Sequence, residues 1–191
     1  MEPNDDVELM LRVRDGQDGG AFEELMRRYQ RPLVGFLIRL TNNLDTAQDL
    51  AEETFVRVWQ SAPRYRPSAK FTTWLFTIAS RLAIDHARRA QVRHSVSLDA
   101  PIAAADRSLA ETLADAGPAA DQQVARNQTA ALVRAAVQEL PLEQRTALVL
   151  CEFEDFSYAD AAQAMGCSVK SVELRIYRAK QTLREKLLAV H

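Results

Sequence analysis

The spacing of apolar residues constrains the fold more than any other feature, because they recur every three or four positions along most of the chain. Between residues 44 and 61 they fall at Ala47, Leu50, Ala51, Phe55 and Val58, and acidic side chains occupy the other faces. This period is typical of an amphipathic α-helix with one buried side. Glycine is scarce, with 6 in 191 residues, and no β-rich alternating runs bounded by turns stand out. The sequence therefore predicts an all-α fold.

Further helices follow from the same spacing. A pair is expected within residues 6–31, broken between Gly16 and Gly20, and a long helix is expected at about 71–93. Pro32 marks a helix start or a kink before the apolar run Leu33 to Leu40. Another helix is expected at about 142–153, after Pro141.

A change in composition at about Val96 divides the chain. From Ser97 to Gln123 the sequence is rich in Ala, Asp and Ser, contains Pro101 and Pro118, and is net acidic. Such a segment is typical of a linker. We therefore expect two small helical domains, at 6–94 and 124–191, joined by a flexible acidic linker at 95–123.

The net charge of −2 at first argues against a nucleic-acid-binding protein. The charge is unevenly distributed, however, because residues 81–94 and 170–186 are basic, whereas the N-terminus, residues 45–53 and the linker are acidic. This pattern favours a protein that meets phosphates at two places and a basic partner elsewhere.

A helix–turn–helix pattern lies near the C-terminus. Ser157 is a candidate N-cap, Asp160 lies in the first turn that follows, and Gly166 can adopt the left-handed conformation that ends a helix. Ser168 can cap the next helix. This spacing is typical of a domain that places its second helix in the major groove of DNA.

The second helix of this pattern separates into two faces on a helical wheel. Its predicted core face comprises Val169, Val172, Ile176, Leu183 and Leu187. Its outward face comprises Lys170, Ser171, Leu174, Tyr177 and Arg178, with Arg175 at the flank. Arg178 suits bidentate contact with guanine, and Lys170 and Arg175 suit phosphates. A solvated basic helix on a bundle remains the alternative.

Other classes of protein receive little support from the sequence. The three histidines form no credible catalytic or metal-binding set, no glycine-rich phosphate loop occurs, and no cofactor is expected. Cys151 and Cys167 are expected to be reduced thiols, with a disulfide or a metal site as the alternatives. No apolar run is long enough to insert in a membrane, and the acidic start lacks signal-peptide character, so a cytoplasmic location is expected.

Two sets of longer motifs stand out, one in each half of the chain. In the C-terminal half these are residues 139–145, 154–158, 160–166 and 171–180, including Ser171-Val172-Glu173-Leu174-Arg175-Ile176-Tyr177-Arg178. In the N-terminal half they are residues 21–29, Asp49-Leu50-Ala51-Glu52-Glu53-Thr54-Phe55 with Trp59, and Phe71-Thr72-Thr73-Trp74 through Arg89. These motifs resemble the sigma-70 family of RNA polymerase sigma factors, most closely its small extracytoplasmic-function (ECF) branch. The two sets occur in the family's order and cover most of the chain.

The resemblance implies a promoter-recognition factor without catalytic chemistry. Asp49, Glu52 and Glu53 would dock on the clamp helices of the polymerase largest subunit, and the C-terminal domain would meet the flap region of the second-largest subunit. The −10 element would be bound and melted by Arg64, Tyr65, Arg66, Lys70, Trp74, Arg81, Arg88 and Arg89. The −35 element would be read as duplex by Lys170, Ser171, Leu174, Arg175, Tyr177 and Arg178. An anti-sigma factor would be a further partner.

Several alternatives stay open from the residues alone. The acidic side chains at 49–53 also suit a merely solvated face, and Trp74 and Phe76 also suit a plain core. A dimeric helix–turn–helix repressor would explain residues 157–188 but leave 49–59 and 64–93 without a role. A helical scaffold would not depend on Arg178. Glu173 and Leu174 stand where many members carry a basic or small polar residue, which leaves the promoter sequence open.

Overall fold

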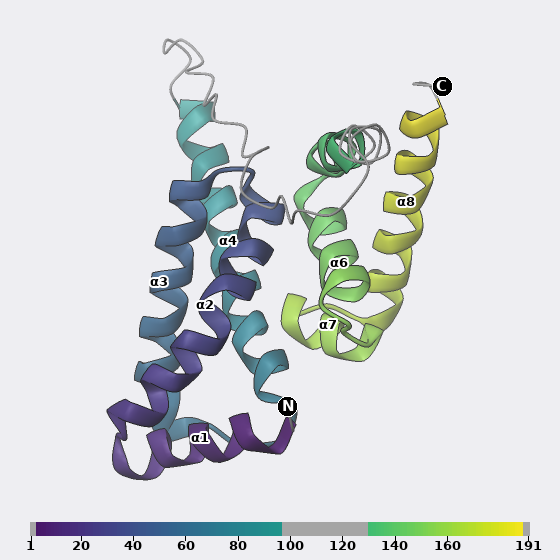
Figure 1. The fold of residues 1–191 in the computed structure, drawn as a ribbon. Helices are drawn as coiled ribbons and strands as arrows, with labels where there is room; N and C mark the ends of the chain where they lie inside the picture. Colours follow the sequence, from purple (N-terminus) through teal and green to yellow (C-terminus); the bar gives the residue numbers. More distant parts are fainter. Residues whose placement is uncertain (1–2, 97–129, 189–191) are drawn as a thin grey trace, which may run out of the picture.

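All regular secondary structure in the described part of the chain is helical, as the sequence predicts (Figure 1). The computed structural model describes residues 3–96 and 130–188. Apart from its first two residues, which belong to a helix, the predicted linker at 95–123 lies outside the described residues.

The N-terminal domain is built from four helices. They are α1 (Pro3–Gly16), α2 (Gly19–Thr41), α3 (Leu44–Ser61) and α4 (Phe71–Val96), with a short 3-10 turn, η1 (Ala62–Arg64), after α3. Helices α2, α3 and α4 form a bundle, and α1 lies across one end of it (Figure 1).

Local sequence explains where these helices begin and end. The carboxylate of Asp18 accepts a hydrogen bond from the Ala21 amide (3.0 Å), and the side chain of Asn43 accepts one from Thr46 (2.8 Å). Both are N-caps that satisfy free amides of the first turn. Pro32 does not start a helix, because α2 continues through it.

A buried ionic network ties α1 to α2. Asp6 is only 5% exposed, and it accepts hydrogen bonds from the Tyr29 hydroxyl and from Arg28 (2.8 Å). Arg28 also binds Asp5 (2.6 Å) and Glu24 (2.7 Å). Burial is the first cause of the raised pKa of Tyr29, and the hydrogen bond to Asp6 adds to it. A buried carboxylate is tolerated here because its partners satisfy it.

The C-terminal domain comprises the helical residues 130–138, α6 (Leu142–Phe153), α7 (Tyr158–Met165) and α8 (Val169–Leu188). Ser157 caps α7 by accepting a hydrogen bond from the Asp160 amide, and Gly166 ends it with a φ of 62°. The Ser168 hydroxyl accepts a hydrogen bond from the Ser171 amide (3.2 Å). The helix–turn–helix prediction is thus confirmed. Val169 is the exception on the core face, since it is 42% exposed at the first position of α8.

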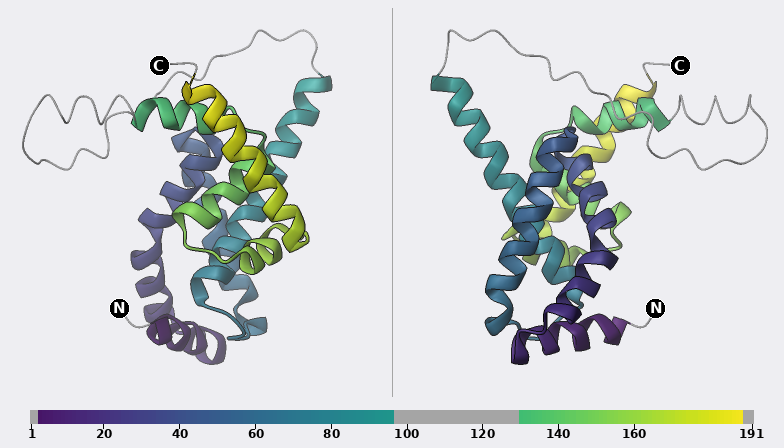
Figure 2. Two further views of the ribbon diagram at one scale, coloured as in Figure 1. Left: turned by 90° about the vertical axis from the view of Figure 1, so that its right-hand side faces the viewer. Right: turned by 60° about the vertical axis from the view of Figure 1, so that its left-hand side comes forward.

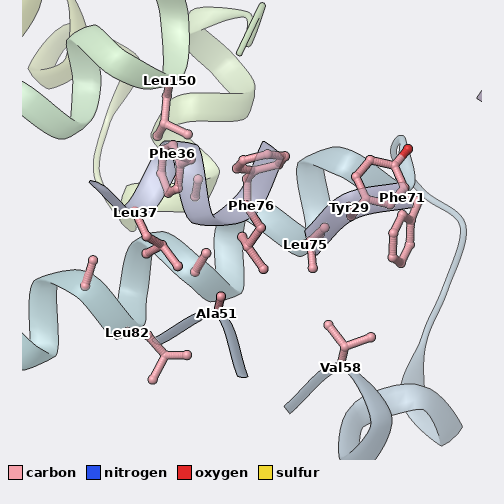
Figure 3. Close-up of a cluster of buried hydrophobic side chains, with 14 of the residues drawn as sticks. Tyr29, Phe36, Leu37, Ala51, Val58, Phe71, Leu75, Phe76, Leu82 and Leu150 are labelled. Atoms are coloured by element: carbon pink, nitrogen blue, oxygen red, sulfur yellow. The ribbon is translucent and has the colours of Figure 1, made fainter. Parts of the chain in front are cut away.

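The two domains lie side by side (Figure 2), and one cluster of buried apolar side chains extends through both of them. Helix α7 lies against α4, and α6 lies against the end of α2. The Phe36 and Phe76 rings meet edge to face at 5.0 Å, and Phe76 meets Phe156 of the C-terminal domain at 6.2 Å. Figure 3 shows Leu150 reaching from the C-terminal domain toward Phe36. Phe76 therefore belongs to the core.

Candidate functional site

An exposed stripe on α3, called the acidic stripe here, comprises the acidic residues Asp49, Glu52 and Glu53 and the apolar Val56. Their spacing of three and four places them along one side of the helix. Glu53 pairs with Arg57 one turn later (2.8 Å), and both side chains are largely solvent-accessible. Figure 1 shows α3 on the side of the bundle away from the C-terminal domain. The stripe is therefore open to a partner.

Val56 was missed by the sequence interpretation. It is 49% exposed in the middle of the acidic stripe, although most valines of such helices face the core. Its position, four residues after Glu52 and three after Glu53, could have predicted that it shares the exposed side of the helix with them. An exposed apolar residue between carboxylates suits a protein contact better than plain solvation.

The loop before α4 carries exposed basic side chains on either side of a buried tyrosine. Arg64, Arg66 and Lys70 are exposed, whereas Tyr65 is 2% exposed, with its ring 4.8 Å from that of the half-buried Trp74. The Tyr65 hydroxyl has no hydrogen-bond partner within the described residues, and burial raises its pKa. In this structure Tyr65 packs in the core and does not form part of the surface.

The melting stripe of α4, defined here as Trp74, Arg81, Asp85 and Arg88, follows from a spacing of seven, four and three residues. Residues at this spacing share one side of a helix. Arg81 and Arg88 are exposed, as is Arg89 on the neighbouring side. The part of the stripe from Arg81 to Arg88 faces the C-terminal domain, where Arg81 donates to the Gln163 carbonyl (3.3 Å).

The outward face of α8 presents four of its six predicted residues to solvent, namely Lys170, Leu174, Tyr177 and Arg178. Leu174 is 47% exposed and Tyr177 is 65% exposed, which is unusual for such large apolar groups. Exposed basic side chains with apolar side chains between them can contact phosphates, the edges of nucleobases and thymine methyl groups.

The other two predicted residues of α8 are engaged within the chain. The Ser171 hydroxyl lies 2.9 Å from that of Ser168. Arg175 is half-buried and donates to Glu143 (2.5 Å) and to the Cys167 sulfur (3.1 Å). Arg175 therefore acts in this structure as a link between α8 and α6.

Glu173 also lies exposed on α8, beside Lys170 and Leu174. The sequence interpretation noted it only as a departure from the usual pattern. No ion pair of Glu173 with another described residue is found. A free carboxylate on this face can accept a hydrogen bond from a cytosine amino group.

The structure contains no feature of a metal centre within the described residues, since no three His, Cys, Asp or Glu side chains cluster there. Cys151 and Cys167 are free thiols, as expected from the sequence. Burial raises the pKa of the Cys151 thiol to about 11, which makes it a poor nucleophile. None of the described helices is long and apolar enough to cross a bilayer.

Two segments of the chain match known protein families. Residues 25–93 match the family described as Sigma-70 region 2, and residues 130–183 match Sigma-70, region 4. Among similar curated proteins, the RNA polymerase sigma-H factor of Pseudomonas aeruginosa is 33% identical over 186 residues, which cover 95% of this chain and 93% of that protein. The RNA polymerase sigma factor CarQ of Myxococcus xanthus is 36% identical over 179 residues, covering 93% and 95%.

Solved structures of similar fold include a sigma factor bound to an anti-sigma factor and a protein bound to the cytosolic domain of its partner. The sigma factor RpoE in complex with the anti-sigma factor NepR from Bartonella quintana has a TM-score of 0.68 and 26% identity, over 87% of this chain and 96% of that one. CnrH in complex with the cytosolic domain of CnrY has a TM-score of 0.66 and 25% identity, over 97% and 98%. These superpositions span both domains.

Proposed function

Because the chain belongs to the sigma-70 family of RNA polymerase sigma factors, in its ECF branch, we propose that three exposed surfaces carry out the separate steps of promoter recognition. A sigma factor directs RNA polymerase to specific promoters and starts transcription there, and it is not an enzyme. That function belongs to this chain. The assignment of residues to each step is the proposal, with the cytoplasm as the place of action.

The acidic stripe of α3 is proposed to dock on the clamp helices of the polymerase largest subunit. The carboxylates of Asp49, Glu52 and Glu53 suit a basic partner, and Val56 offers an apolar centre for the contact. The position of α3 away from the C-terminal domain supports this assignment, because that domain leaves the stripe accessible in this structure. The C-terminal domain is proposed to meet the flap region of the second-largest subunit.

The loop at 64–70 and the melting stripe are proposed to bind and open the −10 element. Arg64, Arg66 and Lys70 are exposed cations at the start of α4, suited to the backbone of an unpaired strand. Arg81, Arg88 and Arg89 extend the cationic surface along the helix. Trp74 is half-buried, so its exposed edge is available to a base. Tyr65 would join this surface only if the loop rearranges, since its side chain is buried.

The outward face of α8 is proposed to read the −35 element in the major groove. The exposure of Lys170, Leu174, Tyr177 and Arg178 along one side of a capped recognition helix is the observation that carries the proposed function. Arg178 is assigned to a guanine and Leu174 to a thymine methyl group. Arg175 would need to leave Glu143 before it could hold a phosphate.

An anti-sigma factor is the remaining proposed partner. Both solved relatives described above were determined with an anti-sigma factor or with a partner's cytosolic domain. Their similarity covers most of this chain, including both domains. We therefore propose that an anti-sigma factor binds these two domains.

The proposed function is tested with two variants that fail at different steps. Purified wild-type chain should co-elute with RNA polymerase core on gel filtration, whereas Glu52→Lys/Glu53→Lys should not, because reversed charges repel a basic clamp. Arg178→Ala should still co-elute but should lose about 5-fold to 150-fold in −35-dependent initiation, the cost of one bidentate base contact.

Arg184→Ala is the matched control for Arg178→Ala, since it removes an exposed arginine farther along α8. A wild-type chain that ignores core but binds duplex DNA tightly would instead support a conventional repressor. Unchanged run-off transcription with Arg178→Ala would contradict the role of α8 and favour a scaffold.

A further inference from the structure

The melting stripe of α4 is partly covered by the C-terminal domain. Arg81 donates to the Gln163 carbonyl at the end of α7, and a nitrogen of Arg88 lies 3.8 Å from a carboxylate oxygen of Glu143 at the start of α6. A hollow of about 310 Å³ remains at this seam, lined by both domains. Two arginines proposed to bind the −10 strand are thus engaged within the chain.

These contacts are individually weak. The Arg88 side chain is 68% exposed and its distance to Glu143 is long for an ion pair, and exposed pairs of this kind contribute little. The hollow leaves the arginines accessible to water. The covering of the stripe therefore depends on contacts elsewhere between the two domains.

Stronger contacts lie at the C-terminal end of α2. The last carbonyls of a helix have no partner inside it. Here the Arg39 carbonyl accepts a hydrogen bond from the Gln138 amide (2.9 Å), and the Leu40 carbonyl accepts one from Arg145 (2.7 Å). The guanidinium also suits the negative end of the helix dipole. The C-terminal domain thus caps α2.

The Arg39 side chain adds further contacts to this cap. It lies 3.2 Å from Glu154 and 5.1 Å from the centre of the Phe153 ring, so it contacts the C-terminal domain twice. The Glu154 side chain is 14% exposed, so a carboxyl oxygen accepts the hydrogen bond from Arg39 away from bulk water, whether the carboxyl is ionised or protonated. The apolar contacts of Phe76 with Phe156 and of Phe36 with Leu150 lie close by.

Promoter geometry makes this arrangement incompatible with bound DNA. Elements at −10 and −35 are about 25 base pairs apart, which is roughly 85 Å at 3.4 Å per base pair. In the structure α4 and α7 are in direct contact. The two reading surfaces cannot reach both elements unless the domains separate.

We propose that the free chain masks itself: the C-terminal domain covers the melting stripe of α4, and a latch at the end of α2, formed by Arg39, Gln138, Arg145 and Glu154, holds it there. The partner of the covered surface is thus the chain's own helix–turn–helix domain. This inference rests on the proposed function only in assigning the melting stripe to the −10 element.

A charge swap in the full-length chain tests the latch. Arg39→Glu removes the guanidinium that contacts Glu154 and Phe153 and places a second carboxyl group beside Glu154. It should therefore open the chain and raise its radius of gyration in small-angle X-ray scattering above the roughly 16 Å of a compact protein of this length. Arg39→Glu/Glu154→Arg restores an opposite pair and should return the radius toward the wild-type value. Arg27→Glu, which makes the same charge change at an exposed pair within α2, should leave it unchanged.

A second variant separates the effect of the latch from local misfolding caused by the new charge. Gln138→Ala removes the donor to the Arg39 carbonyl without adding charge, and it should open the chain to a smaller extent. A wild-type chain that scatters as two separate bodies would overturn the proposal. An Arg39→Glu chain as compact as the wild type would overturn the role of the latch.

The failure of the latch and the failure of the proposed function are distinguishable. Scattering uses the free chain and needs neither polymerase nor DNA. Run-off transcription with core should need less Arg39→Glu than wild-type chain for half-maximal signal, because no masking opposes promoter binding. A change in scattering without any transcription would uphold the latch and refute the assignment of the melting stripe.

Discussion

At the scale of single residues, the outward face of α8 combines basic, apolar and acidic groups within two helical turns. Lys170 and Arg178 supply charge attraction to phosphates and guanine, while Leu174 and Tyr177 offer apolar surface. Glu173 has the opposite charge and is exposed beside them. A carboxylate at such a place weakens attraction to DNA in general, so its presence favours a specific acceptor role.

We predict that Glu173 selects a cytosine in the −35 element. Glu173→Gln keeps the shape but loses the charge, and it should relax the preference at one base pair while strengthening binding to unrelated sequences. The loss of discrimination should be about 5-fold to 150-fold, as for one side-chain contact to a base edge. Binding of the polymerase complex to promoters randomised across the −35 element measures this.

Glu185→Gln is the control, because Glu185 is also exposed on α8 but lies three turns farther along. It should not alter base preference at any position. If both variants keep the wild-type preference, Glu173 makes no base contact.

At the scale of the elements, the turn between α7 and α8 contains one glycine with a left-handed backbone. Gly166 has a φ of 62°, a left-handed conformation that glycine adopts without strain, and a Cβ added there would meet nothing within 4 Å. A side chain at position 166 would therefore destabilise the fold through backbone strain and not through a steric clash. The turn holds α8 with its outward face free.

We predict that Gly166→Ala lowers stability by about 1 kcal/mol, which corresponds to a thermal midpoint lower by about 2–4 °C for a chain of this size. Circular dichroism of the full-length chain on heating measures the midpoint. Gly19→Ala, in the first turn of α2 where φ is not left-handed, should leave the midpoint within about 1 °C. Equal midpoints for the two variants would show that the turn can relax.

At the scale of the whole molecule, the contact between the domains contains a largely buried titratable group, the carboxyl of Glu154. Burial raises the pKa of Glu154 at the latch to about 7, Arg39 opposes this shift and Asp155 adds to it. Separation of the domains would hydrate the carboxyl and return its pKa toward the ordinary value near 4.5. The closed arrangement therefore binds this proton more tightly than the open one.

It follows that the closed arrangement is favoured at low pH. Protonated Glu154 contributes its full stabilisation below about pH 4.5, and this contribution is lost as the pH rises through about 7. We predict a larger radius of gyration at pH 8 than at pH 6. Glu154→Gln, which mimics the protonated carboxyl, should remove this dependence and stay compact. A pH dependence that persists in Glu154→Gln would assign it to another group.

The sequence by itself determined the helices, the caps of α7 and α8, and the outward face of α8. Periodicity and capping depend on residues within a few positions of one another, so Ser157, Gly166 and Leu174 were interpretable without knowledge of the rest of the chain. The two motif sets were likewise local, and the families that match residues 25–93 and 130–183 agree with them.

Only the tertiary structure decided which of the predicted surface residues are free. Tyr65 is buried against Trp74, and Arg175 binds Glu143 32 residues away. The tertiary structure also brings Arg39, which the sequence analysis did not single out, to Glu154 115 residues away. Such pairs depend on how segments far apart in the sequence meet, which no local spacing encodes. The packing of the two domains is the largest case, because a linker permits many arrangements and the contacts between the folded surfaces select among them.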